Sequence, residues 1–512
     1  MCAAQRLQRT GGTHARRLGR FHRISSETVH SGKLERVPPS RHEKGVSVHP
    51  APPAPDDLPA RDAYAALRHA PYRRYLAGNL LANIGRQAVS IAATWQIYQW
   101  TNSATALGLV GLVNVIPLLL FVLSAGALAD RIDRRVIIVR CMAAVAALSL
   151  ALALVSAFHA RIPDHPVLQA ANRGLHAIAL TFERHVDPAS LRFDNPALPI
   201  VYLLLFLHAI VRVIGAPARG SIVPLLVPSS ALSNAITWSS STFELSTVLG
   251  PAMGGAIVAV AGFEIVYALD VLFALSLVVA LLGVRMPPRR GTPSAAPRPG
   301  TLEGARFIRR HQPLLAALTL DLFAVILGGA IILLPIYADK ILHVGPAGLG
   351  WLRAAPALGA ICMAFFVAHS RPFRRPGLVI LWSVAGFGAA TIAFGLSTSF
   401  LFSLLALFLS GAFDNISVVV RHSVVQLMTP DHLRGRVTSV NQLFIGSSNE
   451  ISALRAGLVA ALVGPVLATT LGGLGTILVT GAVALIWPSL KTLPPLHQLQ
   501  PEPDGPPSNK NG

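Results

Sequence analysis

The chain has 512 residues, of which 53% are hydrophobic and only 13% are charged. A helix that crosses a bilayer needs about 20 consecutive apolar residues. Runs of that length recur along the chain, so the composition excludes an ordinary water-soluble enzyme and predicts a protein in the lipid bilayer. The formal net charge of +20 would suit a nucleic-acid partner. Most of the basic excess lies in an N-terminal tail and in short loops beside apolar runs, however, so we expect no nucleic acid.

Residues 1–70 open the chain without apolar periodicity and are rich in Arg, Pro, Ser and His. This composition predicts a disordered basic tail, and the tail holds no hydrophobic segment of a signal peptide. Beside plain disorder, three interpretations stay open: a surface for anionic lipid, a transit peptide, and a start upstream of the true one near Val46 or Val48. Disorder or a wrong start is the expectation.

Twelve apolar segments follow, and each predicts a membrane-spanning helix. In chain order they cover residues 75–99, 105–129, 136–158, 198–219, 234–260, 264–284, 314–338, 347–369, 377–397, 400–420, 437–462 and 465–487. A polar insert at 159–197 follows the third segment, a linker at 285–313 follows the sixth, and a tail at 491–512 ends the chain. The expected fold class is an all-α polytopic membrane protein with twelve transmembrane helices. The segments 234–260 and 437–462 are the weakest, because they are rich in Ser, Asn and Gln.

The arginines of the short loops lie on one side of these segments. They follow the second segment, fill the linker and recur at 371–375 and 434–436, whereas the opposite side carries Lys340 and an insert whose charges balance. Lys and Arg are retained on the cytoplasmic face, and an even number of spans puts both termini on the same side. We therefore expect a protein of the bacterial inner membrane with both termini in the cytoplasm.

The two halves of the membrane region resemble each other. An offset of about 200 residues brings Gly255 over Gly457 and Gly262 over Gly464. Spans four and five then match spans ten and eleven in the same orientation. This repeat predicts two six-helix bundles related by an axis along the membrane normal. The bundles cover residues 71–284 and 314–490.

Two motifs point to a known family. The turn after the second span reads Gly126-x-Leu128-x-Asp130-Arg131-x-Asp133-Arg134-Arg135, and the fifth span contains Gly250-Pro251-x-x-Gly254-Gly255. The turn is similar to the signature of the major facilitator superfamily, and the glycine motif resembles the helix-five motif of its proton-driven exporters. Segments 349–356, 368–377 and 429–436 resemble the group of that superfamily that includes the enterobactin exporter. The resemblance implies the major facilitator fold.

The resemblance also implies a role for each motif. Asp130, Arg131, Arg134 and Arg135 would latch the cytoplasmic side shut and release it during transport, and the glycines of the fifth span would form a seal. The alternative for the first motif is a basic loop that only sets topology. The alternative for the second is ordinary packing of small residues. The second half has no acid beside Arg371, so its latch is degraded.

Ionisable residues inside spans are costly and usually face a cavity. Asp414 and Arg421 share a face of the tenth span, His208 and Arg212 share a face of the fourth, and the first span carries a polar stripe. The candidates for transport or proton coupling are Asp414, Arg421, Arg212, Arg86, Glu244, Asp321 and Glu450, and the candidates for polar cavity lining are Asn79, Asn83, Gln87, His208 and Ser417. The alternative for each is a buried contact between helices, which we favour for Asp270. In the superfamily, helices one, four, seven and ten line the cavity.

These features predict a secondary transporter, a proton-coupled exporter that works by alternating access. Asp414 is the expected proton carrier, with Arg421 as its partner or competitor, and the cavity arginines suit an anionic or catechol-bearing cargo such as a siderophore. A broad drug-efflux pump or an importer on the same fold stays an alternative, as does a receptor or scaffold without transport. We expect no catalytic site, metal or cofactor, because three cysteines and no catalytic motif offer none. A monomer is the simplest expectation.

Overall fold

The computed structural model describes residues 62–284, 301–370, 373–430 and 433–499. Helices joined by short turns make up these ranges, and none of the described residues is in a strand. The expected all-α fold is therefore confirmed. The predicted disorder of residues 1–61 and 500–512, and most of the linker, lie outside the described residues.

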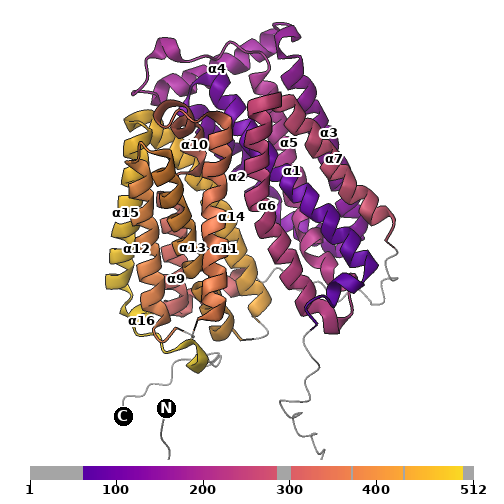
Figure 1. The fold of residues 1–512 in the computed structure, drawn as a ribbon. Coiled ribbons are helices and arrows are strands. Elements are labelled where there is room, and N and C mark those ends of the chain that lie inside the picture. The colour runs from indigo at the N-terminus through magenta and orange to yellow at the C-terminus, as the bar shows by residue number, and fades with distance from the viewer. Residues whose placement is uncertain (1–61, 285–300, 371–372, 431–432, 500–512) are drawn as a thin grey trace, which may run out of the picture. The chain divides into compact units, whose positions relative to one another are not determined.

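Six long helices form the N-terminal bundle, drawn in indigo to magenta in Figure 1. They are α1 (Ala70–Thr101), α2 (Ala104–Arg131), α3 (Arg134–Ala157), α5 (Leu198–Ile222), α6 (Leu232–Ala261) and α7 (Phe263–Leu282). The polar insert contains α4 (Pro166–Phe182), which lies across one end of the bundle. We call this end the insert side, and the opposite end, where the described chain begins at Asp62, the tail side.

The C-terminal bundle, drawn in orange to yellow, lies beside the first (Figure 1). Its seventh expected span is interrupted, because α9 ends at Gly328 and the helix resumes only after a 3-10 turn. The elements are α8 (Thr301–Arg310), α9 (Gln312–Gly328), α10 (Leu334–Ile336), the π-helical turn η8 (Tyr337–Ile341), α11 (Gly345–His369), α12 (Pro376–Gly395), α13 (Phe400–Met428), α14 (Arg434–Val463), α15 (Pro465–Ile486) and α16 (Pro488–Lys491).

Ten helical segments of the described chain are long and apolar enough to cross a membrane. Every expected span is among them except the first and the eleventh, which correspond to α1 and α14. Those two helices have 32 and 30 residues, so it is their polarity, not their length, that excludes them from the ten apolar segments. The number of twelve spans stays a prediction, and it requires that α1 and α14 cross beside the others.

Matching glycines end matching helices in the two halves. Gly262 follows α6 with φ of +85°, and Gly464 follows α14 with φ of +86°. Only glycine adopts this backbone region without strain. The offset that places one glycine over the other in the sequence therefore places the same sharp turn at the insert side of both bundles.

Buried polar groups hold the N-terminal bundle together. Gln96 of α1 donates to the Ser156 hydroxyl over 2.8 Å and accepts a hydrogen bond from the Tyr267 hydroxyl of α7 over 2.7 Å. Asp270 of α7 accepts from the Ser149 hydroxyl of α3 over 2.6 Å. Because lipid offers no hydrogen-bond partner, such contacts fix the neighbours of a polar side chain. Asp270 has the interhelical contact that a structural role requires.

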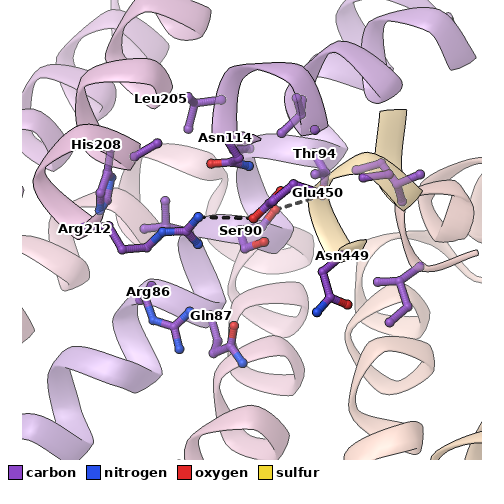
Figure 2. Close-up of a pocket in the computed structure, with 18 of the residues that line it drawn as sticks. Arg86, Gln87, Ser90, Thr94, Asn114, Leu205, His208, Arg212, Asn449 and Glu450 are labelled. Atoms are coloured by element: carbon purple, nitrogen blue, oxygen red, sulfur yellow. Dashed lines mark hydrogen bonds and ion pairs between the residues drawn. The ribbon is translucent and has the colours of Figure 1, made fainter. Parts of the chain in front are cut away.

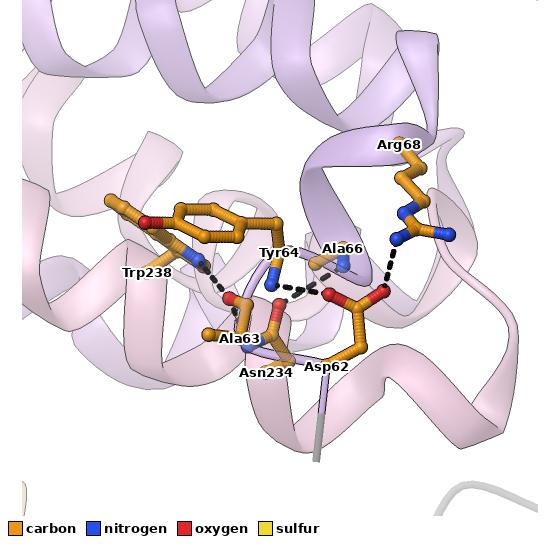
Figure 3. Close-up of polar contacts among 7 residues, drawn as sticks. All are labelled: Asp62, Ala63, Tyr64, Ala66, Arg68, Asn234 and Trp238. Carbon is orange, nitrogen blue, oxygen red and sulfur yellow. Dashed lines mark hydrogen bonds and ion pairs between the residues drawn. The ribbon is translucent and has the colours of Figure 1, made fainter. Parts of the chain in front are cut away.

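The first described residues are tied to the tail-side end of α6 (Figure 3). The Asn234 amide donates to the Ala63 carbonyl over 2.8 Å, and its oxygen accepts from the Ala66 N–H over 3.0 Å. The Trp238 indole donates to the same Ala63 carbonyl over 3.0 Å. This segment, placed in the tail by the sequence, is therefore part of the N-terminal bundle.

The insert connects the two bundles at the insert side. The buried Glu183 carboxylate accepts hydrogen bonds from the Ser103 hydroxyl over 2.8 Å and from the Thr105 N–H over 2.9 Å. It thereby caps the N-terminus of α2, where a negative charge is favourable. The next residue, Arg184, donates its backbone N–H to the Ala461 carbonyl of α14 over 3.0 Å.

Candidate functional site

Glycines bring the two bundles into backbone contact toward the insert side. A Cβ atom on Gly108 of α2 would lie 3.1 Å from the Gly457 Cα of α14. A Cβ atom on Gly350 of α11 would lie 2.6 Å from the Pro251 carbonyl oxygen of α6. Larger side chains would have to push the helices apart, so these glycines close the path between the bundles on this side.

The glycines of the helix-five motif face two different neighbours. A Cβ atom on Gly250 would lie 2.8 Å from the Ile84 carbonyl oxygen, and one on Gly254 would lie 2.8 Å from the Ala88 Cα, both on α1. Gly255 instead contacts α11 of the other bundle. The motif thus packs α6 against its own bundle through two glycines and against the second bundle through a third.

The charged hairpin holds the tail-side ends of its own bundle. Arg134 donates to the Ser221 carbonyl in the last turn of α5 over 3.3 Å, and Arg135 donates to the Leu282 carbonyl at the end of α7 over 2.8 Å. Cations are favourable at helix C-termini, where carbonyls lack partners. Gly126 has open space around it, Arg131 is exposed, and the side chain of Asp130 lies outside the described part of the structure.

Two cavities lie between the helices of the two bundles. The first, which we call the central cavity, has a volume of about 290 Å³ and is lined from α1, α2, α5, α11, α14 and the break after α9. The second, the tail-side cavity, has a volume of about 850 Å³ and extends along α5 and α6 to Pro224 and Ile236. Four residues line both cavities: Arg86, Arg212, Asn449 and Glu450.

An ion pair between the bundles stands at this shared wall. Arg212 Nη2 of α5 lies 3.2 Å from Glu450 Oε1 of α14 (Figure 2). Arg86 of α1 lies nearby, with its guanidinium 6.0 Å from the centre of the Phe243 ring. The contact joins one charged side chain from each bundle, so any separation of the bundles at this level must break it.

The interrupted seventh span contributes backbone to the central cavity. Gly329 lines the cavity, and its carbonyl accepts from the Ser452 hydroxyl over 3.3 Å and from Arg455 over 3.4 Å. A break in a membrane helix is tolerated where side chains satisfy the freed backbone groups. Two α14 side chains therefore support the break in α9.

The structure brings most of the candidate residues of α1, α5, α6 and α14 to the cavities. Gln87 and His208 line the central cavity, and Asn79, Asn83 and Glu244 line the tail-side cavity. With Arg86, Arg212 and Glu450, these residues surround one continuous region between the bundles. They come from both bundles, with α1, α5 and α6 in the first and α14 in the second.

The candidates of α9 and α13 lie elsewhere. Among the described residues, Asp321, Asp414, Ser417 and Arg421 line neither cavity. The ion-pair partner of Arg421 is Asp321 of α9, and both side chains are buried. Arg421 is thus not the partner of Asp414, since the two residues share a helix face but α9 supplies the nearer acid. Asp414 is half-buried and has no hydrogen bond or ion pair among the described residues.

Arg353 of α11 was missed by the sequence reasoning. It lines the central cavity and has no hydrogen bond or ion pair within the part of the chain that the structure describes. The signal was present, because Arg353 is a lone charge inside an apolar span. Arg353 occupies a position at which the motif of residues 349–356 specifies no residue type. The family resemblance therefore pointed only to its neighbours.

Comparison with known proteins gives a family. The family model described as Major Facilitator Superfamily matches residues 75–453. The enterobactin exporter EntS of Citrobacter koseri is 24% identical over 440 residues, which are 86% of this chain and 96% of that protein. The exporter of the same name from Shigella boydii serotype 18 is 27% identical over 293 residues, 57% of this chain and 70% of that protein.

Solved structures share the fold. A bacterial homolog of the human lysosomal transporter Spinster, in an inward-facing and unoccupied conformation, aligns with a TM-score of 0.58 at 15% identity, over 85% of this chain and all of that one. A bacterial homologue of the iron transporter ferroportin, in an inward-facing state, aligns with a TM-score of 0.56 at 14% identity, over 83% of this chain and 99% of that one. At these identities the likeness shows the fold alone.

Proposed function

Because this chain belongs to the major facilitator superfamily and is a multi-pass transporter of the inner membrane, we propose that it is a proton-coupled exporter of a small organic anion. The observation that carries the proposal is the Arg212–Glu450 ion pair, which joins the two bundles at the wall shared by the two cavities. In alternating access the bundles rock about a site at mid-membrane. This contact lies where such rocking would break and remake it.

The charges of the cavities support an anionic cargo. Three arginines (Arg86, Arg212 and Arg353) line the central cavity against one glutamate (Glu450). Arginine binds carboxylate and catecholate oxygens through charge-assisted hydrogen bonds. The relatives at 24% and 27% identity are named as enterobactin exporters, which favours a siderophore or a related secondary metabolite as cargo.

The shape of the path indicates from which side cargo can enter this conformation. Glycine contacts close the insert side, whereas the tail-side cavity reaches toward the tail-side ends of α5 and α6. If both termini are cytoplasmic, as the arginine distribution predicts, this conformation admits cargo from the cytoplasm. The gating hairpin would then close the tail side in the other half of the cycle.

Glu450 replaces Asp414 as the leading proton carrier. Its carboxylate is at the shared wall and is paired with the opposite bundle. In an exchange the proton and the anion occupy the carrier in alternate steps, so Glu450 would take up its proton outside after the anion has left Arg212 and would lose it to the cytoplasm. Asp414 stays the second candidate, because it is an acid within α13 without a partner among the described residues.

Transport in everted membrane vesicles tests the proposal. With an acidic lumen, the wild-type protein should accumulate 2,3-dihydroxybenzoate or enterobactin against its gradient. Glu450→Gln should reduce this proton-driven accumulation more than about tenfold and leave downhill exchange in place, because a general proton-transfer group is lost while the cavity remains. Glu264→Gln is the matched control, since Glu264 lies in the first turn of α7 and lines neither cavity.

Other results of these transport assays would change the proposed function or the proposed proton carrier. Full accumulation by Glu450→Gln and its loss in Asp414→Asn would move the proton to α13. Accumulation of the anion in right-side-out vesicles would make the protein an importer, and flux of unrelated hydrophobic cations would make it a broad drug pump. Absence of any flux with correctly inserted protein would favour a receptor or scaffold.

A further inference from the structure

The two cavities form one path with a charged division across it. The Arg212–Glu450 contact of 3.2 Å lies at the wall that they share. An anion that enters the tail-side cavity passes Arg219 and then reaches Arg212, where it competes with the Glu450 carboxylate. Figure 2 shows this ion pair beside the other residues that line the central cavity.

The balance of charge changes along this path. The tail-side cavity is lined by three arginines (Arg86, Arg212, Arg219) and two glutamates (Glu244, Glu450). The central cavity is lined by Arg353 in place of Arg219, and Glu450 is the one acidic residue in its lining. The excess of positive charge therefore rises from one to two, so the central cavity attracts an anion more strongly than the tail-side cavity does.

Two arginines of the central cavity, Arg86 and Arg353, have no hydrogen bond or ion pair among the described residues, and Arg353 is the one that does not also line the tail-side cavity. Glu450 is the sole acid of that lining and is already bonded to Arg212. Arg353 comes from α11 and has no hydrogen bond or ion pair among the described residues. An arginine within a membrane is costly without a partner, and a bound anion would offset that cost.

Neutral polar groups complete the lining. The Ser90 hydroxyl of α1 and the Asn114 amide of α2 line the central cavity, and neither side chain has a hydrogen bond among the described residues. Their donors and acceptors suit hydroxyl groups on a ligand. A site with two arginines that lack an ion pair and with two open neutral groups fits a hydroxylated anion better than a simple inorganic ion.

The volume limits what this site can hold. Pockets for drug-sized molecules span about 300–1,000 Å³, and the central cavity has about 290 Å³ against about 850 Å³ for the tail-side cavity. A single hydroxylated aromatic ring with its carboxylate fits the smaller volume. A cargo built from several such units must leave the rest of its body in the larger one.

We propose that the central cavity is a distinct subsite for one hydroxylated anionic group of the cargo, no larger than a single ring, with Arg353 as its binding cation and the Arg212–Glu450 pair as the division that the group displaces. This inference rests on the proposed export of an organic anion and adds where the anionic group is bound. It predicts that a single-ring anion binds on the far side of the ion pair, away from Arg219.

Binding to the purified full-length protein in lipid nanodiscs tests the subsite. The probe is 2,3-dihydroxybenzoate, and calorimetry gives the dissociation constant. Arg353→Gln should weaken binding about tenfold to hundredfold, the effect of one hydrogen bond to a charged group, and Arg353→Lys should weaken it less. Arg219→Gln, at the tail-side cavity, and Arg161→Gln, on the exposed surface of the insert, should change it less than threefold.

Two further variants keep the test sharp if Arg353→Gln folds poorly. Ser90→Leu should fill the central cavity and abolish binding of the single-ring probe, while Glu450→Gln should tighten binding because the competing carboxylate is gone. Equal affinity in wild type, Arg353→Gln and Ser90→Leu overturns the subsite, as does a loss confined to Arg219→Gln. Vesicle flux distinguishes the subsite from the proposed function. If the wild-type protein transports the anion but these variants bind the probe unchanged, only the subsite is refuted. If the wild-type protein transports no anion, the proposed function is refuted.

Discussion

Asp321 and Arg421 form an ion pair that is buried between α9 and α13. Removing one member of a buried pair leaves the other charge unpaired and costs about 3–5 kcal/mol. Asp321→Asn should therefore lower the thermal unfolding midpoint of the protein in detergent by several degrees. The double variant Asp321→Asn with Arg421→Met should recover a large part of that loss, because no buried charge is left alone.

The double variant also separates a structural pair from a coupling pair. If the pair only stabilises the C-terminal bundle, the double variant regains proton-driven flux together with stability. If flux stays lost while stability recovers, the two residues take part in transport. An unchanged unfolding midpoint in Asp321→Asn would contradict the buried ion pair itself.

The choice of partner for Arg421 shows what residue spacing can and cannot predict. A separation of seven residues correctly places Asp414 and Arg421 on one face of a helix. It carries no information on which helix faces them, and α9 brings Asp321 closer. Spacing also places His208 and Arg212 on one face of α5, but only the structure joins Arg212 to Glu450 of α14.

The positions of the helices can be predicted from the sequence where apolar runs and turn glycines indicate their ends. The matched Gly262 and Gly464 are predictable, because the same backbone turn is needed at the same place in each half. α1 and α14, which are too polar to be among the ten apolar spans, are two of the three helices that form the wall between the cavities, and α5 supplies the third part with Arg212. A hydropathy pattern cannot foresee contacts such as Gly108 with Gly457, because they depend on how two distant helices approach each other.

The glycine contact between α2 and α14 predicts how one helix pair controls access. Gly457→Val would add a side chain against Gly108 and force the two helices apart. We expect a shift toward a conformation open on the insert side. In a chain whose native cysteines are replaced, a Ser90→Cys probe in the central cavity should react about tenfold faster with an impermeant thiol reagent added from that side.

Gly481→Val in α15 is the matched control for this experiment. A Cβ atom at Gly481 meets no atom within 4 Å, so this change adds the same volume without separating the bundles. Equal labelling of Ser90→Cys in the Gly457→Val and Gly481→Val backgrounds would show that the glycine contact does not hold the insert side shut.

The insert connects the two bundles, in addition to the glycine contacts and the Arg212–Glu450 ion pair. Glu183 caps α2 through two hydrogen bonds, and the neighbouring Arg184 binds the Ala461 carbonyl of α14. A molecule that opens on the insert side must therefore detach this segment from α14. The contacts of the insert therefore add to the free energy that opening on the insert side requires.

Glu183→Ala should loosen this connection. It leaves the buried Thr105 N–H and Ser103 hydroxyl without their acceptor, which costs about 1–3 kcal/mol for each unsatisfied group. Hydrogen exchange should then accelerate about tenfold or more at Thr105 and also at Arg184, whose amide bonds to the other bundle. Asp194→Ala removes an exposed acid from the same insert and should leave both amides unchanged. Faster exchange at Thr105 alone would mean that the cap is local and that the contact of Arg184 with α14 holds without it.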